Sequence, residues 1–188
     1  SEDYIAERMN VIDVEGIHAA RRALRRRIAE TFRAELMRIY EENRSSEPYD
    51  PAAGPAGRRA LKNAALSYLS ELAESEPGIL ALIAAQYHAA DNMTDRMAAL
   101  RLLVDIDRPE RREALAHFYE RYRDDALVLD KWLMLQAVSS LPDTLEQVKA
   151  LLKRSSAPFS SSCGPLPPSA ASSLSSDLFV TACVGATT

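Results

Sequence analysis

Apolar residues recur every three or four positions through the first 154 residues, which predicts a chain built almost wholly from helices. The longest stripe predicts one continuous amphipathic helix over 17–39, with an apolar face made of Ile17, Ala20, Leu24, Ile28, Phe32, Leu36 and Ile39. Its other face carries arginines first and glutamates later, an order that opposes the helix dipole. Packing of the stripe is expected to outweigh that penalty of roughly a few tenths of a kcal/mol per charge.

Prolines, glycines and capping residues divide the rest of this region. A break over 48–57 is followed by predicted helices over 58–73, 79–89, 93–105, from 109 onward, 126–139 and 143–153. Asn92 with Asp95 three residues later resembles an N-cap with its acidic partner, and Pro109 suits a first helical turn. Two apolar faces are expected to point inward: Leu61, Ala65, Tyr68, Leu69 and Leu72 in one helix, and Leu115, Phe118, Tyr119 and Tyr122 in another.

The predicted fold class is all-α, because no window before residue 155 alternates with period two. Helix pairs spaced by roughly 30 to 40 residues favour an α-solenoid, a superhelical array of antiparallel helix pairs. Two regions are expected: a helical domain over 1–154 and a Ser/Pro-rich, low-complexity tail over 155–188. Only one charged residue, Asp177, falls in that tail, so we expect it to be irregular and disordered.

Composition narrows the function classes. A net charge of −4 gives no support for nucleic acid as a partner, and no apolar run is long enough to span a membrane. The first residues, Ser1 to Tyr4, show no signal peptide and no initiator Met, so we expect the chain to start inside a longer protein. Both cysteines, Cys163 and Cys183, fall in the tail, and a helical region without cysteine is compatible with the cytoplasm or, in a eukaryote, an organelle.

Catalytic chemistry is not visible in the sequence. His18, His88 and His117 lie far apart, without the His-Glu-x-x-His spacing of zinc peptidases. The two cysteines form no Cys-x-x-Cys unit, and no Gly-x-Ser-x-Gly, P-loop or dinucleotide fingerprint occurs. No residue of this chain is therefore assigned as catalytic, metal-binding or substrate-binding, and no cofactor is assigned to it.

Three polar or aromatic features have two interpretations each. Asp91, Asn92, Asp95 and Arg96 form a dense polar group that is either a helix cap with a local ion pair or a contact with a partner domain or substrate channel. Trp132 is more typical of a core anchor than of a stacking platform. The arginine run, Arg21, Arg22, Arg25, Arg26 and Arg27, is either an anion-binding patch or a solvated, salt-bridged helix face.

Five segments in order carry a family resemblance across about 150 residues. They are residues 1–7, the helix 58–69 with Arg58-Arg59-Ala60-Leu61-Lys62-Asn63, residues 86–95 with Ala90-Asp91-Asn92-Met93-Thr94-Asp95, residues 129–132 with Leu129-Asp130-Lys131-Trp132, and residues 145–152. Together they resemble the helical C-terminal domain of bacterial-type M1 zinc aminopeptidases, the aminopeptidase N group.

The resemblance implies a part of a zinc aminopeptidase that removes N-terminal residues from peptides. In that family the zinc ligands and the catalytic glutamate lie in a separate catalytic domain, so zinc belongs to the parent enzyme and peptides reach this chain only through it. The helical domain caps the catalytic cleft and limits access to it, and its expected partner is that catalytic domain.

The resemblance ends after Arg154, where a family member continues with an Asn-Pro-Asn-Arg-type segment and further helices. A truncated domain with a divergent tail is therefore expected. A free-standing α-helical scaffold that binds a protein or peptide partner stays open as the alternative.

Overall fold

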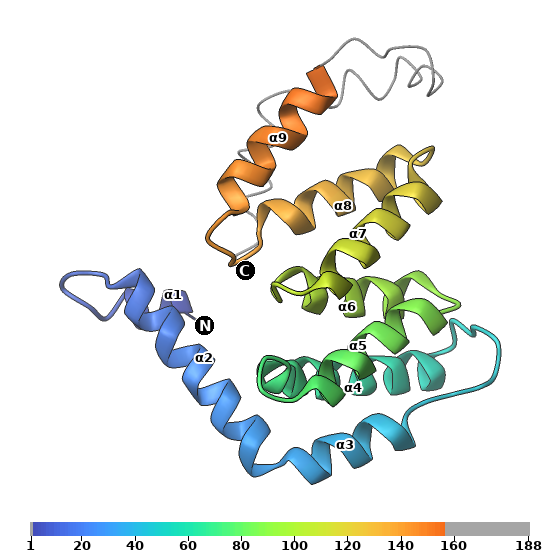
Figure 1. The fold of residues 1–188 in the computed structure, drawn as a ribbon. Coiled ribbons are helices and arrows are strands. Elements are labelled where there is room, and N and C mark those ends of the chain that lie inside the picture. The colour runs from blue at the N-terminus through green and yellow to red at the C-terminus, as the bar shows by residue number, and fades with distance from the viewer. Residues whose placement is uncertain (1, 157–188) are drawn as a thin grey trace. The chain divides into compact units, whose positions relative to one another are not determined.

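The structure is a computed structural model that describes residues 2–156. The described residues form helices joined by short linkers and contain no strand, as Figure 1 shows. They fall into two compact units, residues 1–106 and residues 107 onward. The first unit holds α1 (Glu2–Ala6), α2 (Val14–Thr31), α3 (Arg33–Glu42), α4 (Ala53–Leu69), the 3-10 turn η1 (Ser70–Leu72), α5 (Pro77–Ala89) and α6 (Met93–Val104). The second holds α7 (Pro109–Tyr122), α8 (Ala126–Ala137) and α9 (Thr144–Ser156).

The starts of α2, α5, α6 and α7 follow local signals in the sequence, whereas α4 begins at Ala53, inside the predicted break over 48–57. Pro77 and Pro109 occupy the first helical positions of α5 and α7, where a missing N–H costs no hydrogen bond. The Asn92 side chain accepts a hydrogen bond from the Asp95 N–H at 2.9 Å, which confirms the predicted cap. Asp13 caps α2 in the same way through the Gly16 N–H, and any side chain at Gly16 would clash with the Asp13 carboxylate.

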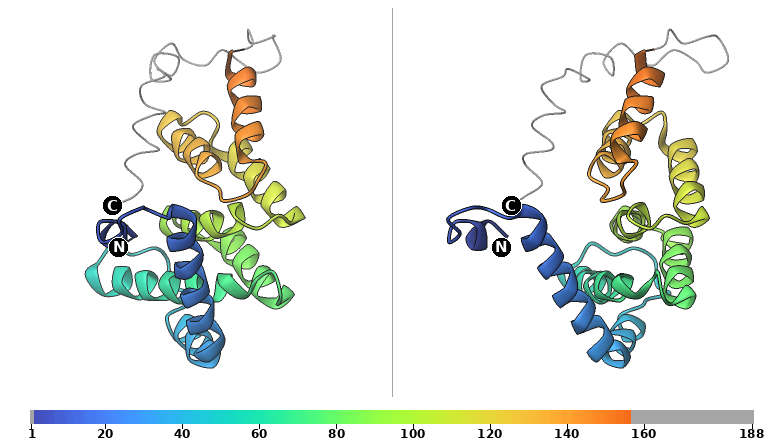
Figure 2. Two further views of the ribbon diagram at one scale, coloured as in Figure 1. Left: turned by 90° about the vertical axis from the view of Figure 1, so that its left-hand side faces the viewer. Right: turned by 60° about the vertical axis from the view of Figure 1, so that its left-hand side comes forward.

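The predicted continuous helix over 17–39 is wrong, because the chain breaks at Phe32. Its backbone leaves the helical region there, with φ −109° and ψ 25°, and separates α2 from α3. Figures 1 and 2 show the resulting change of direction. No proline or glycine causes it. The two halves pack differently: α2 lies against η1 and α4, whereas α3 lies mainly against α4. One straight helix of about 35 Å could not make both sets of contacts.

The predicted inward face of α4 is also wrong in one respect. Leu61 is 50% exposed, whereas the neighbouring Lys62 is buried. The buried positions are Lys62, Ala65, Leu66 and Leu69, a spacing of three, one and three that forms one continuous helical stripe. Ala65, Leu69 and Leu72 are buried as predicted, and Tyr68 is half-buried. The buried stripe includes Lys62 instead of Leu61, so it starts on a charged side chain.

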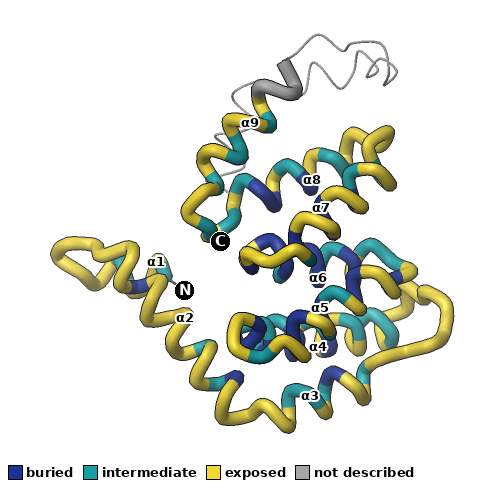
Figure 3. The backbone as a smooth tube through the Cα atoms, in the orientation of Figure 1, coloured by how far each residue is buried: buried dark blue, intermediate teal, exposed yellow. Residues whose placement is uncertain are grey.

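The core of the first unit forms where α4, α5 and α6 pack together. Leu66, Leu69, Ile83 and Leu100 are fully buried there, and Tyr87 joins them from the last turn of α5. In Figure 3 most of the buried segments of the first unit lie in these three helices, whereas α2 is exposed along most of its length. The apolar stripe of α2 is therefore only partly covered, and its Leu24 is 62% exposed.

The second unit packs α7 and α9 on α8. Phe118 and Leu115 are buried as predicted, whereas Tyr119 and Tyr122 are only half-buried. A hydrogen bond of 2.7 Å from Arg111 Nη2 to Gln147 Oε1 joins α7 to α9. The unit therefore has a small apolar core of its own.

The predicted tail over 155–188 lies outside the described residues from position 157 onward, and α9 ends at Ser156. Among the helices that the structure describes, none combines the length and the apolar character needed to cross a membrane.

Candidate functional site

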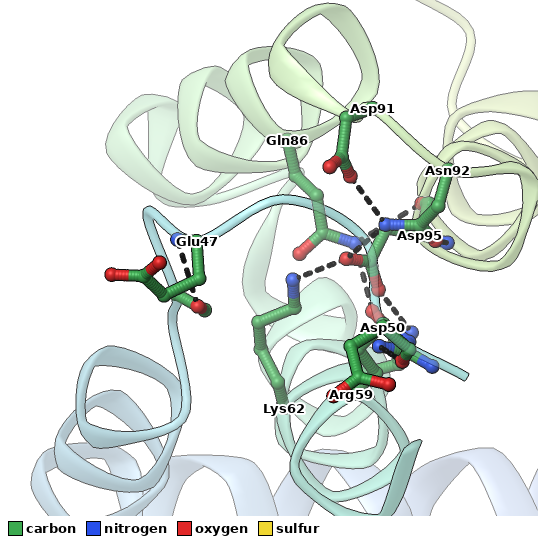
Figure 4. A network of polar contacts seen from close by, with 10 residues as sticks. Glu47, Asp50, Arg59, Lys62, Gln86, Asp91, Asn92 and Asp95 are labelled. Atoms are coloured by element: carbon green, nitrogen blue, oxygen red, sulfur yellow. Dashed lines mark hydrogen bonds and ion pairs between the residues drawn. The ribbon is translucent and has the colours of Figure 1, made fainter. Parts of the chain in front are cut away.

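A buried ion pair connects α4 to the start of α6. Lys62 Nζ lies 2.7 Å from Asp95 Oδ2, and the two side chains are only 11% and 8% exposed. Figure 4 shows the Lys62 side chain reaching from α4 to this carboxylate. The two residues are 33 positions apart in sequence, so the ion pair is not the local one that the polar group at 91–96 suggested.

Amide side chains complete the shell of the Asp95 carboxylate. Asn63 donates to Oδ1 at 2.8 Å, and Asn92 donates to Oδ2 at 3.2 Å. Gln86, from α5, donates to the Asn63 side chain at 2.8 Å and to the Asp95 backbone carbonyl at 3.2 Å. We call these five residues, Lys62, Asn63, Gln86, Asn92 and Asp95, the Asp95 network. It ties three helices together through hydrogen bonds around one buried charge.

The network keeps Asp95 ionised. Burial alone raises the pKa of this carboxyl, but hydrogen bonds from Lys62, Asn63 and Asn92 and the Lys62 charge outweigh burial, so the pKa lies below its usual value. Asp95 therefore carries a full negative charge at neutral pH and is compensated by a full positive charge. Chemically, such a pair is suited to holding structure rather than to exchanging protons near pH 7.

Arg96 belongs to a different contact from Asp95. Its guanidinium is buried and donates to the backbone carbonyls of Tyr87, at 3.4 Å, and of Ala90. These carbonyls lie at the C-terminal end of α5, where helix carbonyls lack partners within the helix and the helix dipole favours a positive charge. Asp91, by contrast, is exposed, and its carboxylate accepts a hydrogen bond from Asn92 at 2.8 Å. The four predicted residues thus divide into one buried ion-pair partner, two capping groups and one exposed acid.

A pocket of about 350 Å³ opens beside the Asp95 network. Its walls come from the loop over 43–50, the first turns of α4 and the turn between α5 and α6. We call it the polar pocket, because charged side chains of both signs line it: Arg58, Arg59 and Lys62 against Glu47, Asp50, Asp91 and Asp95. The structure therefore brings three of the four predicted polar residues, Asp91, Asn92 and Asp95, into one concave site, and leaves Arg96 outside it.

Arg59 fixes the loop that closes one side of the polar pocket. Its Nη1 donates to the Asp50 carbonyl at 2.8 Å, and its guanidinium lies 4.6 Å from the centre of the Tyr49 ring. Asp50 in turn accepts a hydrogen bond from the Ala52 N–H at 2.8 Å, just before α4 begins. The pocket wall is therefore built by side chains rather than left as a loose connection.

The sequence analysis placed Arg58, Arg59, Lys62, Asn63 and Gln86 in segments that carry the family resemblance, but it assigned none of them to a site. The one usable signal was the stripe Lys62, Ala65, Leu66 and Leu69, in which a lysine takes the place of an apolar residue. A charge on the buried face of a helix indicates a partner of opposite charge elsewhere in the chain. Which acid supplies it depends on how α4 packs on α6.

Trp132 lies in the second unit and is 8% exposed. Its Nε1–H donates to the Leu115 carbonyl at 2.9 Å, and its ring centre lies 5.1 Å from that of Tyr119. The indole thereby links α8 to α7 through one polar and one aromatic contact.

The arginine run on α2 is largely engaged by carboxylates. The pairs are Arg21 with Glu2, Arg25 with Glu71, and both Arg26 and Arg27 with Glu30. Arg25 is the most enclosed of them and also donates to the Ser67 carbonyl at 2.6 Å. Arg21 and Arg25 thus join α2 to α1 and η1, whereas Arg26 and Arg27 pair within α2. This favours the interpretation of the run as a salt-bridged helix face.

No set of three or more His, Cys, Asp or Glu side chains among residues 2–156 is arranged to hold a metal ion. His18, His88 and His117 are exposed and occupy three separate helices. The described residues therefore do not fit a zinc centre.

Comparison with known proteins identifies the relatives of this chain. The family "Domain of unknown function (DUF3458_C) ARM repeats" matches residues 1–161. The chain belongs to the DUF3458_C family. The chain is 35% identical to aminopeptidase N of Escherichia coli, over 83% of this chain and 18% of the relative. It is 38% identical to aminopeptidase N of Caulobacter vibrioides, over 80% of this chain and 17% of the relative. The chain thus spans less than a fifth of the length of either relative.

A solved structure has the same fold. Aminopeptidase A of Legionella pneumophila, in complex with aspartic acid, matches 81% of this chain and 19% of that chain with a TM-score of 0.69 at 24% identity. The DUF3458_C domain is therefore an all-α, ARM-repeat helical domain, and its relatives identify it as a C-terminal domain of an M1 aminopeptidase.

Proposed function

We propose that this domain caps the catalytic cleft of a zinc aminopeptidase that removes N-terminal residues from peptides, and that it limits access to the cleft without a catalytic group of its own. The zinc and the catalytic residues belong, on this proposal, to another part of the parent. The proposed partner is the catalytic domain, and the proposed compartment is the cytoplasm.

One exposed surface carries the proposal. Six large apolar side chains within residues 4–14 are 37% to 82% exposed: Tyr4, Ile5, Met9, Val11, Ile12 and Val14. We call them the N-terminal apolar surface. Isolated exposed apolar residues are ordinary, but a dense group of this kind is typical of a surface that another protein part covers. The relatives are more than four times as long as this chain, so they contain further parts that could cover such a surface.

The test combines this chain with the catalytic portion of the Caulobacter vibrioides relative, prepared without its own helical segment. We expect the two to co-elute in size-exclusion chromatography and the complex to hydrolyse a long peptide more slowly, relative to alanine 4-nitroanilide, than the catalytic portion alone. The double substitution Val11→Asp with Ile12→Asp should abolish co-elution. The matched control is Leu127→Asp, which changes an exposed apolar residue of α8 and should leave co-elution intact.

Two results would contradict the proposal. The first is zinc-dependent turnover by this chain alone, because the domain would then be catalytic. The second is failure of the wild-type chain to associate with the catalytic portion while it captures an unrelated peptide or protein, which would favour the free-standing scaffold.

A further inference from the structure

The polar pocket contains charges that the fold does not use. The Lys62–Asp95 pair compensates itself inside the Asp95 network. Arg59 is engaged by the Tyr49 ring and the Asp50 carbonyl. Three charged groups around the rim are left to consider: Arg58, Glu47 and Asp91.

These three groups are accessible and form no ion pairs with one another. Arg58 is exposed, and within residues 2–156 its guanidinium has no carboxylate partner. The Glu47 and Asp91 side chains are exposed too, and neither carboxylate has a cationic partner in the described part of the chain. Most other arginines of this unit are paired, so an unpaired arginine beside two unpaired acids in one pocket is a distinctive arrangement.

We propose that the polar pocket binds a small zwitterion, a free amino acid or a short peptide, with its carboxylate on Arg58 and its ammonium group on Asp91. An arginine forms paired hydrogen bonds with a carboxylate, and carboxylates favour an ammonium group. A ligand with a single charge would leave one side of the pocket uncompensated. The volume of about 350 Å³ lies at the small end of known ligand sites, which suits a molecule of this size.

This inference goes beyond the cleft-capping role, and beyond the expectation that peptides reach the domain only through the parent. It needs neither zinc nor a catalytic domain. Its test therefore uses this chain alone, so a failure of one proposal leaves the other intact.

The first experiment titrates the 15N-labelled full chain with matched probes and follows amide shifts in the NMR spectrum. L-alanine and L-alanyl-L-alanine carry both charges, N-acetyl-L-alanine only the carboxylate and L-alaninamide only the ammonium group. We expect a zwitterion to shift amides of 45–50 and 91–95 with a Kd of about 1 mM, a strength that a few charged contacts support. Both capped probes should bind at least about tenfold more weakly, which corresponds to about 1.4 kcal/mol. Comparing alanine with the dipeptide distinguishes the two sources of the zwitterion.

The second experiment assigns the two ends of the ligand. Arg58→Gln should weaken binding of the zwitterion and remove the residual binding of N-acetyl-L-alanine. Asp91→Asn should likewise weaken binding of the zwitterion, and it should remove the residual binding of L-alaninamide. Both residues are exposed, so the circular dichroism spectrum should be unchanged. Arg22→Gln, on an exposed arginine of α2, is the control and should leave binding unaltered.

Three outcomes would overturn the inference. One is the absence of localised shifts with alanine and with the dipeptide up to about 50 mM, far above the expected Kd. Another is equal binding of the capped and uncapped probes. The third is unchanged affinity in both Arg58→Gln and Asp91→Asn.

Discussion

Lys62 Nζ and Asp95 Oδ2 lie 2.7 Å apart, and both side chains are about nine-tenths buried. Asn63 and Asn92 hold the carboxylate from other directions, so the charge pair is enclosed by hydrogen bonds. Taking two charges out of water is costly, and the pair compensates that cost only while both partners are present. Removing one partner should therefore lower the free energy of unfolding more than removing both.

The first prediction concerns that asymmetry. Asp95→Asn should lower the free energy of unfolding by about 3 kcal/mol, because it leaves the Lys62 ammonium buried without a counter-charge. The double variant Lys62→Met with Asp95→Asn should recover part of that loss. Urea unfolding followed by circular dichroism, arranged as a double-mutant cycle, measures the coupling. Additive effects of the two substitutions would contradict the prediction.

The second prediction is the pH dependence of the same pair. The pKa of Asp95 is lower in the folded chain than in the unfolded one, where it is about 3.9. The unfolded state therefore binds the proton first, so the contribution of Asp95 is fully present above about pH 4 and is lost as the pH falls through the folded-state pKa. Urea unfolding measures how far the free energy of unfolding falls between pH 6 and about pH 3. We expect this fall to be smaller in the Asp95→Asn variant than in the wild type. An equal loss in both would contradict the assignment.

The third prediction separates two arginines of α2. Arg25 pairs with Glu71 at 2.7 Å, donates to the Ser67 carbonyl and lies 4.6 Å from the Tyr68 ring centre. Its guanidinium is only partly exposed, so Arg25→Gln should cost about 1–2 kcal/mol. Arg22→Gln should change the stability by less than about 0.5 kcal/mol, the usual range for an exposed substitution. Hydrogen exchange should show the loss of protection in α2 first, and equal effects of the two changes would refute this role of Arg25.

The fourth prediction concerns the second unit. Trp132→Phe removes the hydrogen bond to the Leu115 carbonyl, which should lower the free energy of unfolding by about 0.5–1.5 kcal/mol. Hydrogen exchange of the α7 and α8 amides should become faster. The matched control is Leu127→Ala, because Leu127 is 76% exposed on the same helix and should have little effect. Unchanged exchange in Trp132→Phe would mean that the hydrogen bond adds nothing to the packing.

The features that the sequence predicted depend on neighbouring residues. Asn92 caps α6 because its acceptor lies three residues before the Asp95 N–H, and Pro109 begins α7 because its missing donor costs nothing there. These effects act within one helical turn, so they can be derived without knowledge of the tertiary fold.

The features that the sequence did not predict depend on tertiary packing. Lys62 finds Asp95 across 33 residues, and no local rule selects that acid among the many in the chain. Leu61 and Lys62 are adjacent, so a rotation of α4 by about 100° decides which of them is buried. The position of the break at Phe32 likewise follows from the different neighbours of α2 and α3, since neither proline nor glycine marks it.

The corner at Phe32 has a consequence for sequence change. Within an unbroken helix, adding one residue turns everything beyond it by about 100° and would misplace every side chain downstream. Here the break at Phe32 separates α2 from α3, so a one-residue insertion in α2 can leave the orientation of α3 unaltered. Such an insertion should still be costly within α2, because it turns the residues on one side of it by about 100° and separates Arg25 from Glu71 or from the rest of the buried face.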